Sequence, residues 1–222
     1  ALEQFLSHVP PASGLAYVVV QHLDPNHKGI MVELLQRATT LPVRQITDRL
    51  TVEPNHVYVI PPNQALTVTG GVLHLAVPAQ PRGMRLPINL FLRSLAHDQG
   101  DRAIGVVLSG MGSDGTLGLQ AVKQHGGLTL AQAPESAQFD SMPRSAIAAG
   151  WVDIVALASE MPDRILRVTA EQAHDAQLTD DSELSNAQAL AAILTLLRDR
   201  SKHDLSDYKP TTLRRRIQRR MG

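Results

Sequence analysis

The sequence contains no cysteine. This absence excludes structural disulfides, thiolate metal sites and a cysteine nucleophile, so any nucleophile is to be sought among the serines and threonines. No apolar stretch approaches the roughly 18 residues that a membrane span requires, and the first residues lack the basic and apolar regions of a signal peptide. The sequence therefore predicts a cytoplasmic protein with no membrane insertion.

The formal net charge is zero, with 21 Lys and Arg against 21 Asp and Glu, but the charges are unevenly distributed. Residues 198–222 contain nine basic and three acidic residues, which leaves 12 basic and 18 acidic residues in 1–197. Two oppositely charged segments are thus joined in one chain. A length of 222 residues suffices for one sizeable α/β domain together with a fragment of another.

Apolar runs alternate with helical patterns along most of the chain, which is typical of parallel strands buried on both faces. The pattern "ALTVTGGVLHLAV" over 65–77 predicts an antiparallel hairpin that turns at two glycines. We expect an α/β fold, namely a doubly wound, mostly parallel sheet with helices on both faces and an added hairpin. The expected strands are 14–22, 41–46, 56–62, 103–109, 126–132 and 151–157, and the expected helices are 29–38, 86–100, 115–125, 142–150 and 159–173.

The domain organisation follows from a change in composition after residue 173. The stretch "HDAQLTDDSELS", residues 174–185, is polar and acidic without an apolar period, so it is predicted to be a linker. We therefore expect one domain over 1–173 and a helical C-terminal extension over 186–222. The extension is too short to bury a core of its own.

A glycine-rich loop follows the strand expected at 103–109. Gly110, Gly112 and Gly115 fit the pattern G-x-G-x-x-G, and Glu135 lies about 20 residues further on, as in dinucleotide-binding folds. Asp114 argues against this interpretation, because its charge would repel a pyrophosphate at the start of the following helix. A nicotinamide-dependent oxidoreductase therefore remains only an alternative. Asp114 could also simply cap the helix that it precedes.

Two chemically capable side chains follow expected parallel strands. His22 closes the run "YVVVQH", and Asp114 lies in the loop after "IGVVLSG". Loops beyond the carboxyl ends of parallel strands are where ligands and chemistry gather in open α/β sheets. Each residue taken singly is explained by capping or by exposure to solvent. Together they provide two of the three members of an acyl-transfer triad, in which the carboxylate orients the imidazole.

Several segments resemble the catalytic domain of chemotaxis protein-glutamate methylesterases of the CheB type. In chain order they are "VVVQHLDP", "VYVIPPN", "VVLSGMGSDGTLG", "LAQ" and "MPRSAIAAG", and they span roughly residues 1–170. The resemblance implies a hydrolase that removes methyl groups from glutamyl methyl esters on chemoreceptor helices and can deamidate particular glutamines. It implies His22 as the catalytic histidine, Asp114 as the triad aspartate and Met111 as a methionine lying against that histidine. No metal or organic cofactor is expected for this reaction.

The sequence departs from the CheB pattern at the nucleophile. That family carries a serine in a Ser-x-Gly-Gly turn after its first strand, and no residue of this chain matches it; "ALEQFLSHVPP" is similar to the later part of the helix after that turn. Ser109 and Ser113 are too near Asp114 in sequence to lie easily on the far side of His22. We therefore expect little or no ester hydrolysis from this chain as given, and an unpaired sheet edge that invites pairing with another chain. The alternative function is a non-catalytic receptor-binding or regulatory module.

The basic C-terminal stretch resembles the opening of the small helical N-terminal domain of CheR-type methyltransferases. An Asp-Tyr-Lys segment precedes a basic helix there, as in "SDYKPTTLRRRIQRRMG". The resemblance implies a bifunctional methylesterase and methyltransferase, whose S-adenosylmethionine is expected only in a methyltransferase domain that this chain does not contain. Tyr208 is the one aromatic residue in the stretch, so nucleic acid is not the expected partner. The candidates for contacting an acidic receptor helix are Arg214, Arg215, Arg216, Arg219 and Arg220.

Overall fold

The structure is a computed structural model of the 222-residue chain, and it describes residues 1–21, 30–81 and 84–173. The chain divides into two compact units, Ala1–Leu166 and Arg167–Gly222. The first unit contains nearly all of the described residues, and of the second only residues 167–173 are described. The linker and basic extension predicted for 174–222 lie outside the described residues, so the predicted domain boundaries remain predictions.

Six parallel strands form two three-stranded sheets within the described part of the first unit. β1 (Tyr17–Val19), β4 (Val57–Val59) and β2 (Val43–Gln45) pair in the order β1-β4-β2. β7 (Ile104–Val107), β8 (Leu128–Gln132) and β9 (Ile154–Ala156) pair in the order β7-β8-β9. Every residue of β4 and of β8 is buried. The continuous apolar runs in the sequence therefore predicted central parallel strands correctly.

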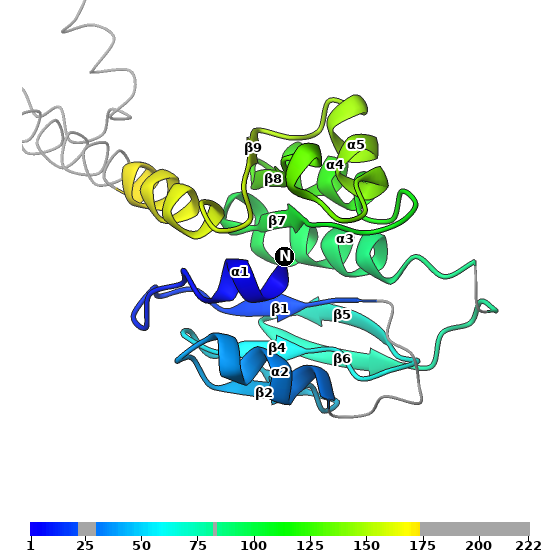
Figure 1. Cartoon of the computed structure of the whole chain (residues 1–222). Coiled ribbons are helices and arrows are strands. Elements are labelled where there is room, and N and C mark those ends of the chain that lie inside the picture. Colours follow the sequence, from blue (N-terminus) through cyan, green and yellow to red (C-terminus); the bar gives the residue numbers. More distant parts are fainter. Residues whose placement is uncertain (22–29, 82–83, 174–222) are drawn as a thin grey trace, which may run out of the picture. The chain divides into compact units, whose positions relative to one another are not determined.

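β1 and β7 run in the same direction in Figure 1, so the carboxyl ends of both parallel sheets lie on one side of the unit. Among the described strands β1 pairs with β4 alone, and β7 pairs with β8 alone. The expected parallel sheet is thus present as two separately hydrogen-bonded halves. β1 and β7 are edge strands of these two sheets, and each is followed in the chain by a predicted site residue, His22 after β1 and Asp114 after β7.

The expected hairpin is confirmed. β5 (Ala65–Thr69) pairs antiparallel with β6 (Val72–Ala76), and Gly70 and Gly71 form the two-residue turn with φ of 59° and 71°. Positive φ at both positions is what this kind of hairpin turn requires, and glycine adopts it without strain. A two-residue strand that the sequence analysis did not predict, β3 (Leu50–Thr51), adds to β6.

The helices expected at 29–38, 86–100, 115–125 and 142–150 are present with slightly shifted bounds, and the short N-terminal helix agrees with what the family resemblance implied. They are α1 (Leu2–Leu6), α2 (Ile30–Ala38), α3 (Pro87–Gln99), α4 (Thr116–Gln124) and α5 (Ser141–Ala148), with 3-10 turns η1 (Gly100–Arg102) and η2 (Pro134–Ser136). Residues 161–173 are also helical. No helix within the described ranges is sufficiently long and apolar for a bilayer crossing.

α3 occupies the centre of the packing because it contacts both β5 and α4. Phe91 and Leu92 are buried on α3, and the core they join includes Leu66 from β5 and Leu119 from α4. A Cβ atom at Gly118 would lie 2.6 Å from the Cβ of Leu92, so only glycine permits this approach of α4 to α3. The close contact of these two helices sets the geometry of the loop between β7 and α4.

Asp98 fastens the end of α3 to the hairpin turn. Its carboxylate accepts hydrogen bonds from the amides of Gly70 and Gly71 and from the side chain of Gln99. Partial burial, the largest single influence, would raise the pKa of Asp98, but these hydrogen bonds and the charge of Arg102 together outweigh it and lower the pKa. The carboxylate form is therefore the one that stabilises the fold.

We expect Asp98→Ala to lower the free energy of unfolding by about 1 kcal/mol at pH 7, because two turn amides lose their acceptor. The pKa of Asp98 is lower in the folded chain than the value of about 3.9 expected when unfolded, so this stabilisation is present above that value. It is lost as the pH falls through the folded pKa. Urea unfolding of both proteins at pH 7 and pH 3 tests this, and an equal difference at both pH values would contradict it.

Candidate active site

Asp114 lies in the loop between β7 and α4, at the carboxyl end of β7, and is only 4% exposed. Its Oδ1 accepts hydrogen bonds from the amides of Asn89 (2.9 Å) and Gly115 (2.9 Å), and its Oδ2 accepts one from the amide of Ile88 (3.1 Å). Ile88 and Asn89 belong to the first turn of α3. The buried charge is thus stabilised by backbone donors and by the positive end of the α3 dipole.

This arrangement corrects the capping alternative for Asp114. The sequence suggested that Asp114 could cap the helix that it precedes, but the N-cap residue of α4 is Gly115, and the side-chain oxygen that accepts from the α4 amide of Gly118 belongs to Asn89. Asp114 instead caps α3, whose first turn lies about 25 residues earlier in the chain. A carboxylate can accept about four hydrogen bonds, so three amide bonds are compatible with a further bond from an imidazole N–H.

The loop that carries Asp114 is held by neighbours from β8 and α5. Gln132, 1% exposed at the end of β8, accepts from the amide of Ser109 (2.9 Å) and donates to Ser136. Ser141, at the start of α5, accepts from the amide of Gly112 (3.0 Å) and donates to the carbonyl of Gly110 (3.2 Å). These contacts fix the loop on both sides of Met111.

The glycines of the loop serve packing as well as turning. Gly112 has φ of +89° and Gly115 has φ of +99°, so both adopt a conformation that glycine favours. Gly110 does not have positive φ, so its backbone conformation does not by itself require glycine. A Cβ there would lie 2.3 Å from the Sδ of Met142, so Gly110 is explained by the close approach of α5.

The geometry argues against a dinucleotide at this loop. A pyrophosphate would need unbonded amides at a helix N-terminus. The amides of Ile88 and Asn89 donate to Asp114, and those of Gly115 and Gly118 donate to the side chain of Asn89. Both helix starts that border Asp114 are therefore already bonded internally. Glu135, the candidate ribose-binding acid, lies in the 3-10 turn η2.

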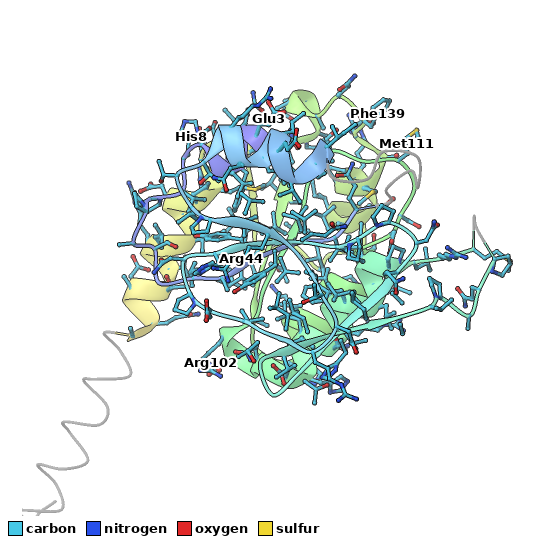
Figure 2. The ribbon with its side chains drawn as sticks, turned by 90° about the horizontal axis from the view of Figure 1, so that it is seen from below. Glu3, His8, Arg44, Arg102, Met111 and Phe139 are labelled. Carbon is cyan, nitrogen blue, oxygen red and sulfur yellow. The ribbon has the colours of Figure 1, made fainter. Side chains whose placement is uncertain are left out.

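Met111 and Phe139 form an apolar rim beside the Asp114 loop. Met111 is 74% exposed and Phe139 is 48% exposed, and Figure 2 shows both side chains at the same end of the molecule. Phe139 is tied to the loop because its carbonyl accepts from the amide of Gly110 (2.9 Å) and its amide donates to Ser109 Oγ (3.0 Å). The rim is available to a partner that approaches Asp114.

Other predicted site residues lie outside the described residues. β1 ends at Val19 and the described chain reaches Gln21, so His22 and its relation to Asp114 and Met111 remain predictions. The five arginines of the C-terminal stretch also lie outside the described ranges. Within those ranges no three His, Asp or Glu side chains form a cluster that could hold a metal ion.

Comparison with known proteins identifies the family. The sequence profile of the CheB methylesterase family matches residues 1–165, which is more than half of the chain. The chain belongs to the CheB methylesterase family. The profile of the all-alpha domain of CheR methyltransferases matches residues 188–222. The family resemblance predicted from the sequence is thereby confirmed, together with the α/β fold.

Individual relatives agree with this assignment. The crystal structure of the Thermotoga maritima CheB methylesterase catalytic domain superposes with a TM-score of 0.69 at 28% identity, covering 75% of this chain and 90% of that one. A protein-glutamate methylesterase/protein-glutamine glutaminase of Anaeromyxobacter dehalogenans is 36% identical over 74% of this chain and 49% of its own length. A putative enzyme of the same name from Leptospira interrogans is 28% identical over 76% of this chain and 88% of its own.

A longer relative matches more of the chain. An uncharacterized 104.1 kDa protein from the hypE 3′ region of Rhodobacter capsulatus is 39% identical over 86% of this chain, which spans only 22% of that protein. The chain therefore spans about half of the Anaeromyxobacter relative and about a fifth of the Rhodobacter one. Because the chain matches only part of these longer proteins, their activities and partners cannot be assigned to it directly.

The sequence analysis did not single out the residues that hold the Asp114 loop, between β7 and α4, in place. The side chains of Asn89, Gln132 and Ser141 bond to it. Asn89 lies in a segment assigned only as helix, Gln132 ends the segment "LAQ" without a role of its own, and Ser141 lies just before the helix expected at 142–150. The one available signal was the order of residues in "LPIN", where Pro87 is typical of the first turn of a helix and an asparagine follows in that turn. Nothing in that signal indicated which loop the asparagine would contact.

Proposed function

We propose that the protein hydrolyses glutamyl methyl esters on the cytoplasmic helices of chemoreceptors, and deamidates particular glutamines there, through a Ser-His-Asp triad. Asp114 orients the imidazole and stabilises the imidazolium, and His22 is the general base. The observation that carries the proposal is the buried Asp114 carboxylate, fixed by three backbone amides beyond the carboxyl end of β7 in a chain of the CheB family. The relatives named protein-glutamate methylesterase/protein-glutamine glutaminase support the reaction.

The triad still needs its serine. No residue of this chain matches the nucleophile of the family, and the Oγ of Ser109 accepts a hydrogen bond from the amide of Phe139. We therefore propose that catalysis depends on a Ser-x-Gly-Gly turn after an apolar strand encoded upstream of Ala1. The edges of β1 and β7, each paired on one side among the described strands, support either a strand inserted there or pairing with a second copy of the chain.

We further propose that the parent protein is a bifunctional methylesterase and methyltransferase. The match of residues 188–222 to the CheR all-alpha domain and the size of the Rhodobacter relative support this. The five arginines of the C-terminal stretch would then contact acidic receptor helices. Met111 and Phe139 would add apolar contacts beside Asp114.

The decisive experiment measures methanol release from a methylated receptor fragment. The protein is produced with the parent reading frame extended upstream through the Ser-x-Gly-Gly turn, and the 222-residue chain serves as the matched control. We expect methanol from the extended protein and almost none from the control. Absence of methanol from the extended protein, when it is folded and binds the receptor, would reject the esterase proposal.

The second candidate function is a non-catalytic receptor-binding or regulatory module. The lack of any residue in this chain that matches the nucleophile favours it. A parent reading frame without Ser-x-Gly-Gly upstream, combined with receptor binding in a pull-down, would support this module instead. Titration with a nicotinamide dinucleotide separates both candidates from an oxidoreductase, since neither is expected to bind it.

A further inference from the structure

Asn89 makes the side-chain bonds that hold the start of α4. It lies in the first turn of α3 and is 5% exposed. Its Oδ1 accepts from the amides of Gly115 (3.0 Å) and Gly118 (2.8 Å). The amide of Gly118 would otherwise be without an acceptor at a buried helix start, which is costly.

Asn89 and Asp114 cap each other's helices. Asp114, which precedes α4, accepts from the backbone of α3, while Asn89, on α3, accepts from the backbone of α4. The amide of Asn89 itself donates to Asp114 Oδ1. Neither cap can shift without disturbing the other. Asn89 is therefore bonded directly to the Asp114 carboxylate, which must keep its position for the triad to work.

One amide is shared between the two side chains. The N–H of Gly115 donates both to Asn89 Oδ1 (3.0 Å) and to Asp114 Oδ1 (2.9 Å), so these two oxygens are at most about 6 Å apart. A neutral amide oxygen can occupy that position without competing charge. A second carboxylate there would repel the first across a largely dry interior, where screening is weak.

We propose that Asn89 is the positioning residue for Asp114, and that its lack of charge is as important as its acceptor oxygen. This inference rests on the proposed function, because it assigns Asn89 to the carboxylate that orients the catalytic imidazole. The oxygen locks α4 and its preceding loop onto α3, and the neutral amide leaves Asp114 as the single negative charge of the pair. These two properties are separable by two substitutions.

Asn89→Leu removes the acceptor at nearly constant size. We expect hydrogen exchange of the Gly118 amide to accelerate at least tenfold. The Ile88 amide should accelerate as well, although it touches only Asp114, because the carboxylate moves when its neighbour is lost. In the extended protein we expect kcat to fall at least tenfold with KM changed less than twofold, since Asn89 is buried and offers little surface to the receptor.

Asn89→Asp keeps the acceptor and adds the charge. We expect wild-type exchange at Gly118 but a fall in kcat of at least tenfold, again with KM nearly unchanged. A merely structural asparagine would tolerate this change, because aspartate is favourable in the first turn of a helix. Asn63→Asp, which adds the same charge at an exposed turn, is the control and should keep wild-type kcat.

Exchange is measured by NMR on the 222-residue chain, and kcat on the extended protein. Wild-type kcat in Asn89→Asp, or unchanged Ile88 exchange in Asn89→Leu, would overturn the positioning role. If Asn89→Leu does not fold, Asn89→Asp decides the point by its kcat. If the wild-type extended protein releases no methanol, the proposed function fails. In that case Ile88 exchange in Asn89→Leu still reports whether Asn89 controls the place of Asp114: a wild-type rate there would overturn the inference, and a faster rate would uphold it.

Discussion

Asp114→Ala is expected to lower the free energy of unfolding of the 222-residue chain by about 3 kcal/mol or more. The reason is that the amides of Ile88 and Asn89 lose a charged, buried acceptor, whereas the amide of Gly115 keeps its second acceptor on Asn89. Each buried donor left without a partner costs about 1–3 kcal/mol. Equilibrium urea unfolding at pH 7 measures the change.

The stability experiment needs two further variants. Ser113→Ala removes an exposed hydroxyl next to Asp114 and should change the free energy of unfolding by less than about 0.5 kcal/mol. Asp114→Asn retains one oxygen acceptor, so its loss should be smaller than that of Asp114→Ala. A loss below about 1 kcal/mol in Asp114→Ala would mean that the carboxylate is not what fastens α3 to the loop.

The second large effect is expected in catalysis. In the upstream-extended protein, His22→Ala should reduce methanol release by at least about 10⁴-fold, because the serine would have no base to accept its proton. Asp114→Asn should reduce kcat by about 10³-fold to 10⁴-fold, because the amide can hold the imidazole in the wrong tautomer. Since triad residues act as a unit, the double variant should be hardly slower than His22→Ala alone.

A matched histidine separates this effect from general damage. His8 is exposed after α1, and His8→Ala should retain methanol release close to that of the wild type. Its side chain lies away from the Met111 and Phe139 rim in Figure 2. Retained activity in His22→Ala would remove His22 as the base, and with it the triad, whatever the similarity to other CheB proteins.

The loop shows what could be inferred from residues alone. The apolar run before Ser109 predicted a buried strand, the glycines after it predicted a loop, and Asp114 was placed in that loop. The structure agrees on the strand and on the place of Asp114 at its carboxyl end. The capping interpretation assigned the carboxylate to the wrong helix. Apolar periodicity indicates which residues share one helix, and it does not indicate that Asp114 bonds to a helix about 25 residues earlier in the chain.

Gly110 makes the same point about packing. Gly110 and Gly112 belong to the same glycine pattern in the sequence, but of the two only Gly112 has positive φ. Gly110 is needed because Met142 from α5 fills the space that a Cβ would take. Such a contact depends on where α5 docks, and no local pattern contains that information.

The sequence by itself determined the alternation of buried strands and amphipathic helices, the hairpin at Gly70 and Gly71, and the CheB family, because these depend on local periodicity, turn chemistry and the order of short motifs within the chain. The tertiary structure alone decided that α3 and α4 cap each other through Asp114 and Asn89. The physical reason is that a buried carboxylate takes whichever amides the packing brings to it. That packing is set by the approach of Gly118 to Leu92, a contact between residues far apart in the chain.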